Sequence, residues 1–178
     1  MPNWCEGSLK VRGKRKDVFR FFTEGVNVYE YFTQDGQCIE ALASKDDWLY
    51  VEPDTSDGFE YIYYSPDNGH YSNLVYIEGT DRAFIDDDAD AISVPVAEDD
   101  HEVTVYASIK QAWDMRVSDW VKLSKATNLH FKLYGIESGG AFTRAIEVNN
   151  GELIENETVS YKTNDDFIWN CPFPWMGG

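Results

Sequence analysis

The middle of this 178-residue sequence is short of basic residues. Positions 24–109 hold two bases, Lys45 and Arg82, against 21 acids, whereas positions 1–23 hold six bases and two acids, and positions 110–178 hold seven and nine. The resulting net charge of −17 disfavours direct binding to nucleic acid or to an anionic membrane, because both carry negative charge. It favours a basic partner, such as a positively charged protein surface.

Cysteines are few, and long apolar runs are missing. Cys5, Cys38 and Cys171 are far apart and odd in number, so we expect free thiols in a reducing compartment and no disulfide. No run approaches the roughly 18 apolar residues of a membrane span, and the polar, basic stretch 1–16 does not resemble a secretory signal. We therefore predict a cytoplasmic protein that binds no membrane.

Motifs for cofactors, metals and nucleophiles are also missing. His70, His101 and His130 show no metal-ligand spacing with one another or with the cysteines. Gly13-Lys14 follows a predicted strand, but the rest of a phosphate-binding loop is lacking. Cys5 falls on the inward side of that strand, which favours a small buried hydrophobe over a nucleophile. We predict neither a cofactor nor a metal site.

One acidic stretch imitates the start of a calcium-binding loop. Asp86, Asp88 and Asp90 have the spacing of its first three ligands. Such a loop also needs glycine at its sixth position and a bidentate glutamate at its twelfth. Those positions hold Ala91 and Ala97, so we predict a solvated acidic loop instead of a calcium site.

The composition supports a folded protein, since hydrophobic residues make up 43% and aromatic residues 15% of the chain. Residues 5–12 alternate between small or apolar and polar side chains, the period of a half-buried strand. Residues 17–24 place Val18, Phe21 and Phe22 on one face of a helix. The chain is thus expected to open with a strand and a helix.

Alternation and turn residues predict the remaining elements. In the acidic middle we expect strands at 48–51, 59–64, 71–77 and 83–85, followed by a loop at 86–100 that contains the apolar island Ile92–Val96. After it we expect a strand at 103–112, a helix from Val117 that stops near Thr127, and strands at 129–134, 141–148 and 152–161. The last two strands are joined by the hairpin turn Asn150-Gly151.

This order of elements predicts an α+β fold, a ferredoxin-like antiparallel sheet with two helices on one face. We expect a single domain over 1–178, with an acidic β-rich insertion at about 26–102 and an apolar C-terminal tail, 162–178, packed on the body. The N-terminal strand should pair inside the sheet, and Trp4 and Trp113 should be largely buried.

Two motifs resemble a known family. Pro2-Asn-Trp-Cys5, followed by an alternating strand, a glycine and a helix, resembles the opening of the YubB-like family, ferredoxin-like proteins of phages and plasmids. Gln111-Ala112-Trp113 stands where that family tends to have Thr-Ala-Trp before its second helix. The proline-containing segment usual after it is replaced here by Asp114-Met115-Arg116. The resemblance implies a fold and a mobile-element origin, and no catalytic residues.

Tyrosine is concentrated in the acidic middle. Residues 59–64, with Tyr71 and Tyr76, form a tyrosine-rich stretch. Such a stretch can mark an interface, because tyrosine offers contact area with little loss of entropy. Alternate tyrosines can equally cover a sheet for reasons of strand propensity alone. Both interpretations stay open at the level of sequence.

Our leading hypothesis is a non-enzymatic interaction protein that presents an acidic surface to a basic partner. The acids could mimic phosphate and occupy the groove of a host nucleic-acid-binding protein, or they could merely confer solubility. The alternative is a hydrolytic or metal-dependent enzyme that uses carboxylates such as Asp86, Asp88 and Glu98. The candidate binding residues are Asp86, Asp87, Asp88, Asp90, Glu98, Asp99, Asp100 and Glu102.

Overall fold

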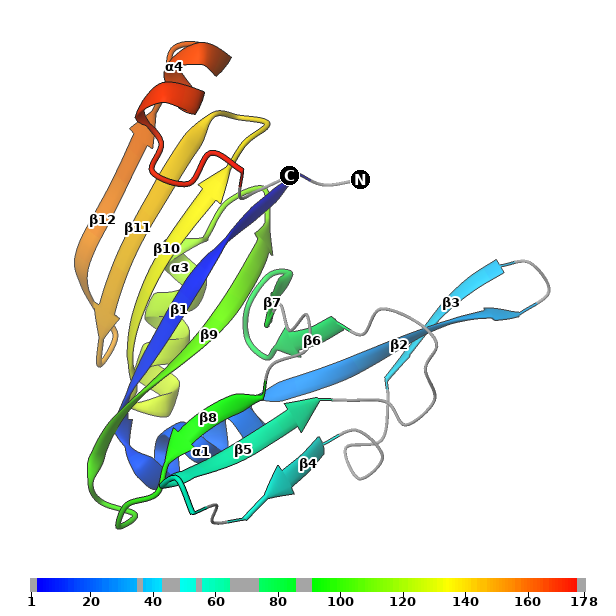
Figure 1. Ribbon diagram of the computed structural model, residues 1–178, viewed down its shortest axis with the longest axis vertical. Coiled ribbons are helices and arrows are strands. Elements are labelled where there is room, and N and C mark those ends of the chain that lie inside the picture. The colour runs from blue at the N-terminus through cyan, green and yellow to red at the C-terminus, as the bar shows by residue number, and fades with distance from the viewer. Residues whose placement is uncertain are drawn as a thin grey trace.

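Two antiparallel sheets make up most of the computed structural model (Figure 1), which describes residues 3–34, 37–42, 49–53, 56–64, 74–85 and 91–175. The larger sheet has nine strands in the order β12-β11-β10-β1-β9-β7-β6-β2-β3, and the smaller has three in the order β4-β5-β8. The elements are β1 (Trp4–Lys14), α1 (Arg15–Glu24), β2 (Val26–Gln34), β3 (Gln37–Leu42), β4 (Leu49–Glu52), β5 (Phe59–Tyr64), β6 (Leu74–Ile77), β7 (Ala83–Ile85), β8 (Ile92–Pro95), β9 (Glu102–Ala112), α3 (Val117–Thr127), β10 (His130–Glu137), β11 (Phe142–Asn149), β12 (Glu152–Ser160) and α4 (Asn164–Asn170).

The prediction of a ferredoxin-like α+β fold is wrong. The molecule is mainly β, with nine strands in one sheet and three short helices among the residues that the structure describes. The acidic middle does not form a separate appendage, because β7 pairs with β9 from Ala83↔Gln111 to Ile85↔Ile109 and so continues the sheet through β6, β2 and β3. Backbone N–H and C=O groups along the free edge of β9 therefore form hydrogen bonds with a strand of the predicted insertion.

The N-terminal strand lies inside the large sheet, as predicted. β1 pairs with β9 on one side and β10 on the other, and its alternate residues Cys5, Leu9 and Val11 are buried. Gly7 lies opposite Gly135, and a Cβ atom at Gly7 would stand 1.9 Å from the Tyr134 carbonyl oxygen. Only glycine allows this close approach of the two backbones.

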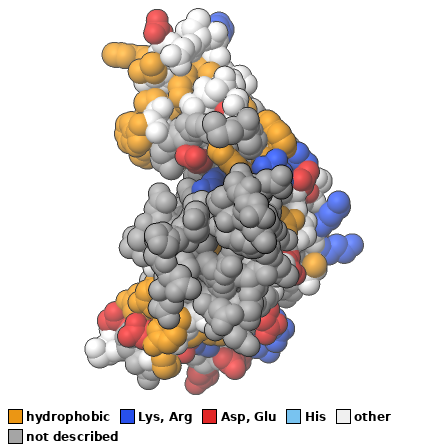
Figure 2. Space-filling model, turned by 90° about the vertical axis from the view of Figure 1, so that its right-hand side faces the viewer, with side chains coloured by type: hydrophobic (Ala, Val, Ile, Leu, Met, Phe, Trp, Pro, Cys, Tyr) orange, Lys and Arg blue, Asp and Glu red, His pale blue; other side chains and the backbone are white. Residues whose placement is uncertain are grey.

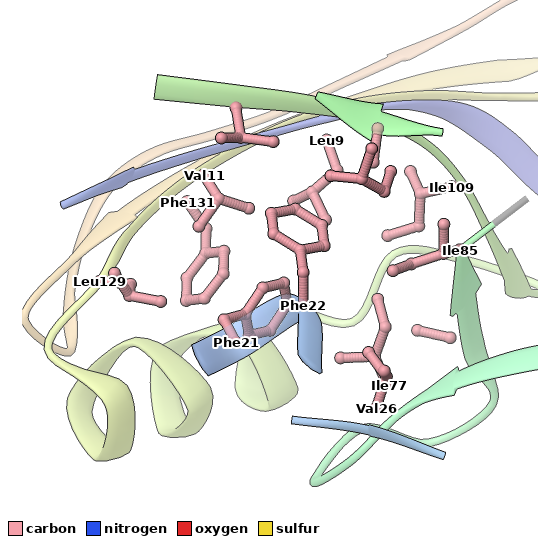
Figure 3. Close-up of a cluster of buried hydrophobic side chains, with 14 of the residues drawn as sticks. Leu9, Val11, Phe21, Phe22, Val26, Ile77, Ile85, Ile109, Leu129 and Phe131 are labelled. Carbon is pink, nitrogen blue, oxygen red and sulfur yellow. The ribbon is translucent and has the colours of Figure 1, made fainter. Parts of the chain in front are cut away.

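The main core lies between the large sheet and the helices α1 and α3 (Figure 3). Phe21 and Phe22 of α1 pack at a centroid distance of 4.9 Å, and Phe21 contacts Phe131 of β10 at 5.3 Å. Trp120 of α3 reaches the same ring at 5.6 Å. The helices are held by apolar burial on one face of each, which is the pattern that their sequences predict.

A buried polar network fixes the start of α3. The Asp119 carboxylate accepts hydrogen bonds from the backbone N–H of Asp81 at 2.9 Å and from Nε2 of Gln111 at 3.1 Å. Gln111 Oε1 accepts from Trp120 Nε1 at 3.2 Å. Because these buried groups satisfy one another, the network costs little to bury and ties the end of β9 to α3.

The expected burial of both tryptophans is wrong for Trp113, which is 50% exposed, while Trp4 is partly buried. Trp113 follows β9 with a positive φ of 66°, which turns its side chain away from the core. The Arg82 guanidinium lies 5.4 Å from the Trp113 ring and 5.8 Å from the Trp4 ring. The two indoles therefore pack on a surface cation.

One local prediction needs correction, because Ile92–Pro95 of the apolar island form strand β8 where a loop was expected. Three elements, β2, β3 and helix α4, were not predicted. The tail packs on the body through Phe167 and Cys171, as expected, yet Trp169 and Trp175 are 86% and 77% exposed. The remaining predicted strands and helices occur close to their expected bounds, except that residues 48 and 71–73 of two predicted strands lie outside the described residues.

The structure describes the side chains of two of the three cysteines. Cys5 and Cys171 are buried and free, and the side chain of Cys38 lies outside the described part. Among the described residues, no helix is long and apolar enough to cross a membrane.

Candidate partner-binding surface

The outer face of the small sheet carries four aromatic side chains in mutual contact. Tyr50 of β4 lies beside Tyr63 of β5 with ring centroids 6.0 Å apart. Along β5, the Tyr61–Tyr63 and Phe59–Tyr61 centroids are 6.4 and 6.5 Å apart. Tyr50 is 61% and Phe59 38% exposed, and the other two are partly buried. We call Tyr50, Phe59, Tyr61 and Tyr63 the aromatic row.

The alternation of β5 explains why this face is aromatic. Successive side chains of a strand point to opposite faces, so Ile62 and Tyr64 turn inward while their neighbours turn outward. Ile62 is fully buried, and the Tyr64 hydroxyl donates a hydrogen bond to the Phe22 carbonyl oxygen of α1 at 2.5 Å. The inner face thus anchors the small sheet to α1 and leaves the aromatic row at the surface.

Two carboxylates hold the hydroxyl groups of the row. The Tyr61 hydroxyl donates to Asp57 Oδ2 at 2.6 Å, and the Tyr63 hydroxyl donates to Glu52 Oε2 at 3.2 Å. The hydrogen bond to Asp57 raises the pKa of Tyr61 above its ordinary 10.0, and loss of hydration followed by the bond to Glu52 raises the pKa of Tyr63. Both phenols are therefore neutral at physiological pH, and each donates a hydrogen bond to a neighbouring carboxylate.

Four of the predicted binding acids lie in a surface turn, residues 98–102, which we call the acidic turn. The turn is closed by a hydrogen bond from the His101 N–H to the Glu98 carbonyl oxygen at 2.9 Å. The side chains of Glu98, Asp99, Asp100 and Glu102 are all exposed. The other four candidates, Asp86, Asp87, Asp88 and Asp90, lie outside the described residues.

Arg15 joins the acidic turn to the small sheet. Its guanidinium forms an ion pair with Glu60 of β5 and a second with Asp99, at 3.3 Å between Nη1 and Oδ1. The Val96 N–H also donates to the Gly58 carbonyl oxygen at 2.9 Å, beside the start of β5. The acidic turn and the aromatic row are consequently parts of one end of the molecule, the lower end in Figures 1 and 2.

Only part of the carboxylate set named for the enzyme alternative lies within the described residues. They contain no group of three or more histidine, cysteine, aspartate or glutamate side chains arranged to hold a metal. Glu98 is exposed on the acidic turn, while Asp86 and Asp88 lie outside the described part. Burial raises the pKa of Cys5 to about 12, so its thiol stays protonated and is a poor nucleophile.

Three of the four residues of the aromatic row could be predicted from the sequence to share one face of a strand. The strand predicted at 59–64 placed Phe59, Tyr61 and Tyr63 on one face, which the structure confirms. The contribution of Tyr50 depends on the pairing Tyr50↔Tyr63 between β4 and β5. No pattern in the sequence marks Asp57 as a hydrogen-bond acceptor for Tyr61.

Comparisons with protein-family models, curated proteins and solved structures find no match to this chain. Membership of the YubB-like family consequently stays a prediction. What the fold and the surface define is a mainly β protein that carries the aromatic row and the acidic turn at one end.

Proposed function

We propose that this protein is a non-enzymatic interaction protein that binds a basic protein surface through the aromatic row and its neighbouring carboxylates. The observation that carries this proposal is the placement of four contacting aromatic side chains on an exposed sheet face, with two hydroxyls held by Asp57 and Glu52. An ordinary outer sheet face is polar. This one instead combines ring faces with negative charge.

Both components of the surface suit lysine and arginine side chains. A cation over an exposed aromatic ring is worth about 0.5–1 kcal/mol, and carboxylates give charge-assisted hydrogen bonds to guanidinium and ammonium groups. The net charge of −17 adds long-range attraction, which speeds association more than it strengthens the complex. Several such contacts together are needed for a stable interface.

We also propose the kind of partner that this protein binds and the kind of genetic element that encodes it. Carboxylates can occupy the same arginine and lysine groups that grip phosphate, so a host nucleic-acid-binding protein presents a fitting basic groove. The resemblance to YubB-like proteins supports a phage or plasmid origin, in which interference with a host protein is a reasonable role. Direct binding of nucleic acid stays disfavoured by the charge.

Aromatic substitutions separate this surface from bulk charge, because they leave the net charge unchanged. The immobilised full-length protein is challenged with host lysate, and captured proteins are quantified by mass spectrometry. We expect Tyr50→Ser to reduce capture of the main basic partner several-fold. Tyr106→Ser is a matched control, since Tyr106 is 63% exposed on the large sheet and Tyr50 is 61% exposed. Equal loss with both variants, or no loss with either, would contradict the proposal.

A second comparison tests where the negative charge acts. Glu52→Gln with Asp57→Asn removes two charges beside the row, whereas Glu152→Gln with Asp165→Asn removes two exposed charges elsewhere. We expect the first pair to weaken capture much more than the second, and both effects to shrink at high salt. If the two pairs weaken capture equally, overall charge alone explains the binding.

A further inference from the structure

A small cavity lies on the face of the large sheet opposite α1 and α3, under the C-terminal segment. Its volume is about 240 Å³, below the roughly 300–1,000 Å³ of sites for drug-sized ligands, so it suits a single side chain. We call it the C-terminal pocket. Its lining residues are Tyr134, Thr143, Ala145, Glu157, Val159, Tyr161, Asn170 and Pro172.

The C-terminal segment that forms one side of the pocket is packed against the large sheet. Phe167 and Cys171 are buried against Ile136 of β10, and the Tyr161 ring meets Phe167 edge-on at 5.3 Å between centroids. Thr163 caps α4 by accepting a hydrogen bond from the Asp166 N–H at 3.1 Å. Figure 1 shows α4 and the segment after it lying over the ends of β10, β11 and β12. One wall of the pocket is therefore fixed by a second, small core.

The lining of the pocket carries charge of one sign, on the exposed residue Glu157. Glu157 is the one charged residue among the lining residues, and in the described part of the chain its carboxylate has no hydrogen bond or ion pair. Its neighbour Glu155 differs, since Lys132 lies 3.4 Å away. Burial raises the pKa of Tyr134 above its ordinary 10.0, although a hydrogen bond from Thr143 opposes the shift. The Tyr134 phenol is thus neutral at physiological pH.

We propose that the C-terminal pocket binds the cationic end of an arginine or lysine side chain, or another organic cation of that size. The Glu157 carboxylate would pair with the cation, and the rings of Tyr134 and Tyr161 would offer π faces. Ala145, Val159 and Pro172 would contact the methylene stem, as apolar surface does for long basic side chains. An anion finds no basic group among the lining residues.

This inference does not depend on the partner proposed above. The pocket belongs to β10, β11, β12 and the C-terminal segment, whereas the aromatic row belongs to β4 and β5. A small cation tests the pocket, and capture from lysate tests the row. Either proposal can therefore fail while the other stands.

The test is an NMR titration of the full-length protein with n-butylguanidinium and, separately, with the neutral n-butylurea. We expect saturable shifts of the amide signals of Ala145, Val159 and Tyr161 with n-butylguanidinium, and at least fivefold weaker binding of n-butylurea. Glu157→Gln should weaken n-butylguanidinium binding about fivefold. Glu152→Gln, on the same strand but outside the pocket, should leave it unchanged.

Two further variants keep the test decisive. Tyr134→Phe retains the ring and should change binding less than about twofold, whereas Tyr161→Leu removes a ring and should weaken binding about threefold. Unchanged dispersion of the remaining amide signals checks that α4 stays in place. Equal binding of the two probes, shifts that do not saturate, or equal effects of Glu157→Gln and Glu152→Gln would each overturn the proposal.

Discussion

In both sheets, successive side chains of a strand point to opposite faces, yet the outer faces carry different residue types. On β1 of the large sheet, the side chains that point away from the helices include Ser8, Lys10 and Arg12, which are exposed and polar. On β5 of the small sheet, the corresponding positions are the aromatic Phe59, Tyr61 and Tyr63. Exposed aromatic area forgoes about 25 cal/mol for each Å² left in water. The period of a strand determines which face of the sheet a side chain lies on. The aromatic residues on the outer face of β5 are the feature that suggests binding.

The inner faces of the two sheets differ much less. Ile62 and Val94 of the small sheet belong to the same buried cluster as Leu9 and Phe131 of the large sheet. Both sheets therefore depend on one core, and we expect them to unfold in one cooperative transition. Substitutions on inner and outer faces test how far this comparison holds.

The largest expected effect is in the centre of the main core. Phe131→Ala should lower the free energy of unfolding by about 3–5 kcal/mol, because a fully buried ring that contacts Phe21 and Trp120 is replaced by a cavity. Urea denaturation followed by tryptophan fluorescence measures the change. Tyr106→Ala on the exposed face of the same sheet is the control and should stay within about 0.5 kcal/mol. A loss below about 1 kcal/mol for Phe131→Ala would mean that this ring is not central to the core.

The next effect tests whether the small sheet shares that core. Ile62→Ala should cost about 2–4 kcal/mol, since Ile62 is fully buried. Unfolding should keep a single transition with an unchanged denaturant slope, which circular dichroism and fluorescence should report at the same midpoint. Two separated transitions would show that the small sheet unfolds by itself.

A smaller effect concerns the outer face of the large sheet and depends on pH. Hydrogen bonds from Lys132 and His130 lower the pKa of Glu147 below its ordinary 4.5, and the bond to Glu147 raises the pKa of Lys132 above 10.5. The stabilisation is thus fully present between about pH 4.5 and pH 10.5. It is lost as pH falls through the lowered pKa of Glu147 or rises through the raised pKa of Lys132.

We expect Glu147→Gln to cost at most about 1 kcal/mol at pH 7, because the Lys132 pair is largely solvent-screened. The difference from the unaltered protein should shrink progressively in denaturation series as the pH is lowered below 4.5. Glu152→Gln, which removes an exposed acid on β12, serves as the control. A difference that persists undiminished in acid would contradict the ion-pair explanation.

The smallest expected effect is on the outer face of the small sheet. Tyr50→Ser should change the free energy of unfolding by no more than about 0.5 kcal/mol, because Tyr50 is 61% exposed. Thermal and urea denaturation measure this directly. A loss above about 2 kcal/mol would assign the aromatic row to stability, and its proposed part in binding would lose its support.

Much of the local structure could be predicted because it depends on short-range pattern. The strands at 59–64 and 83–85 and the helix from Val117 follow from period and turn residues. Strand β8 was missed because Pro95 and the surrounding acids read as a loop, yet Pro95 pairs with Phe59 at the end of the small sheet. The candidate acids at 98–102 were correctly expected at the surface, whereas their link to β5 through Arg15 was not foreseen.

The charge distribution, the buried faces of α1 and α3 and the directions of side chains along each strand follow from the amino-acid sequence. Tertiary structure alone decided that β7 lies beside β9, that Tyr50 lies beside Tyr63, and that the C-terminal segment covers Tyr134. Strands pair through backbone groups that every residue carries. The period of two therefore determines which face a side chain lies on, but it does not determine which strand pairs with which. The pairing of strands is decided only in the complete fold, where all strands compete for the same backbone hydrogen bonds and the same apolar core.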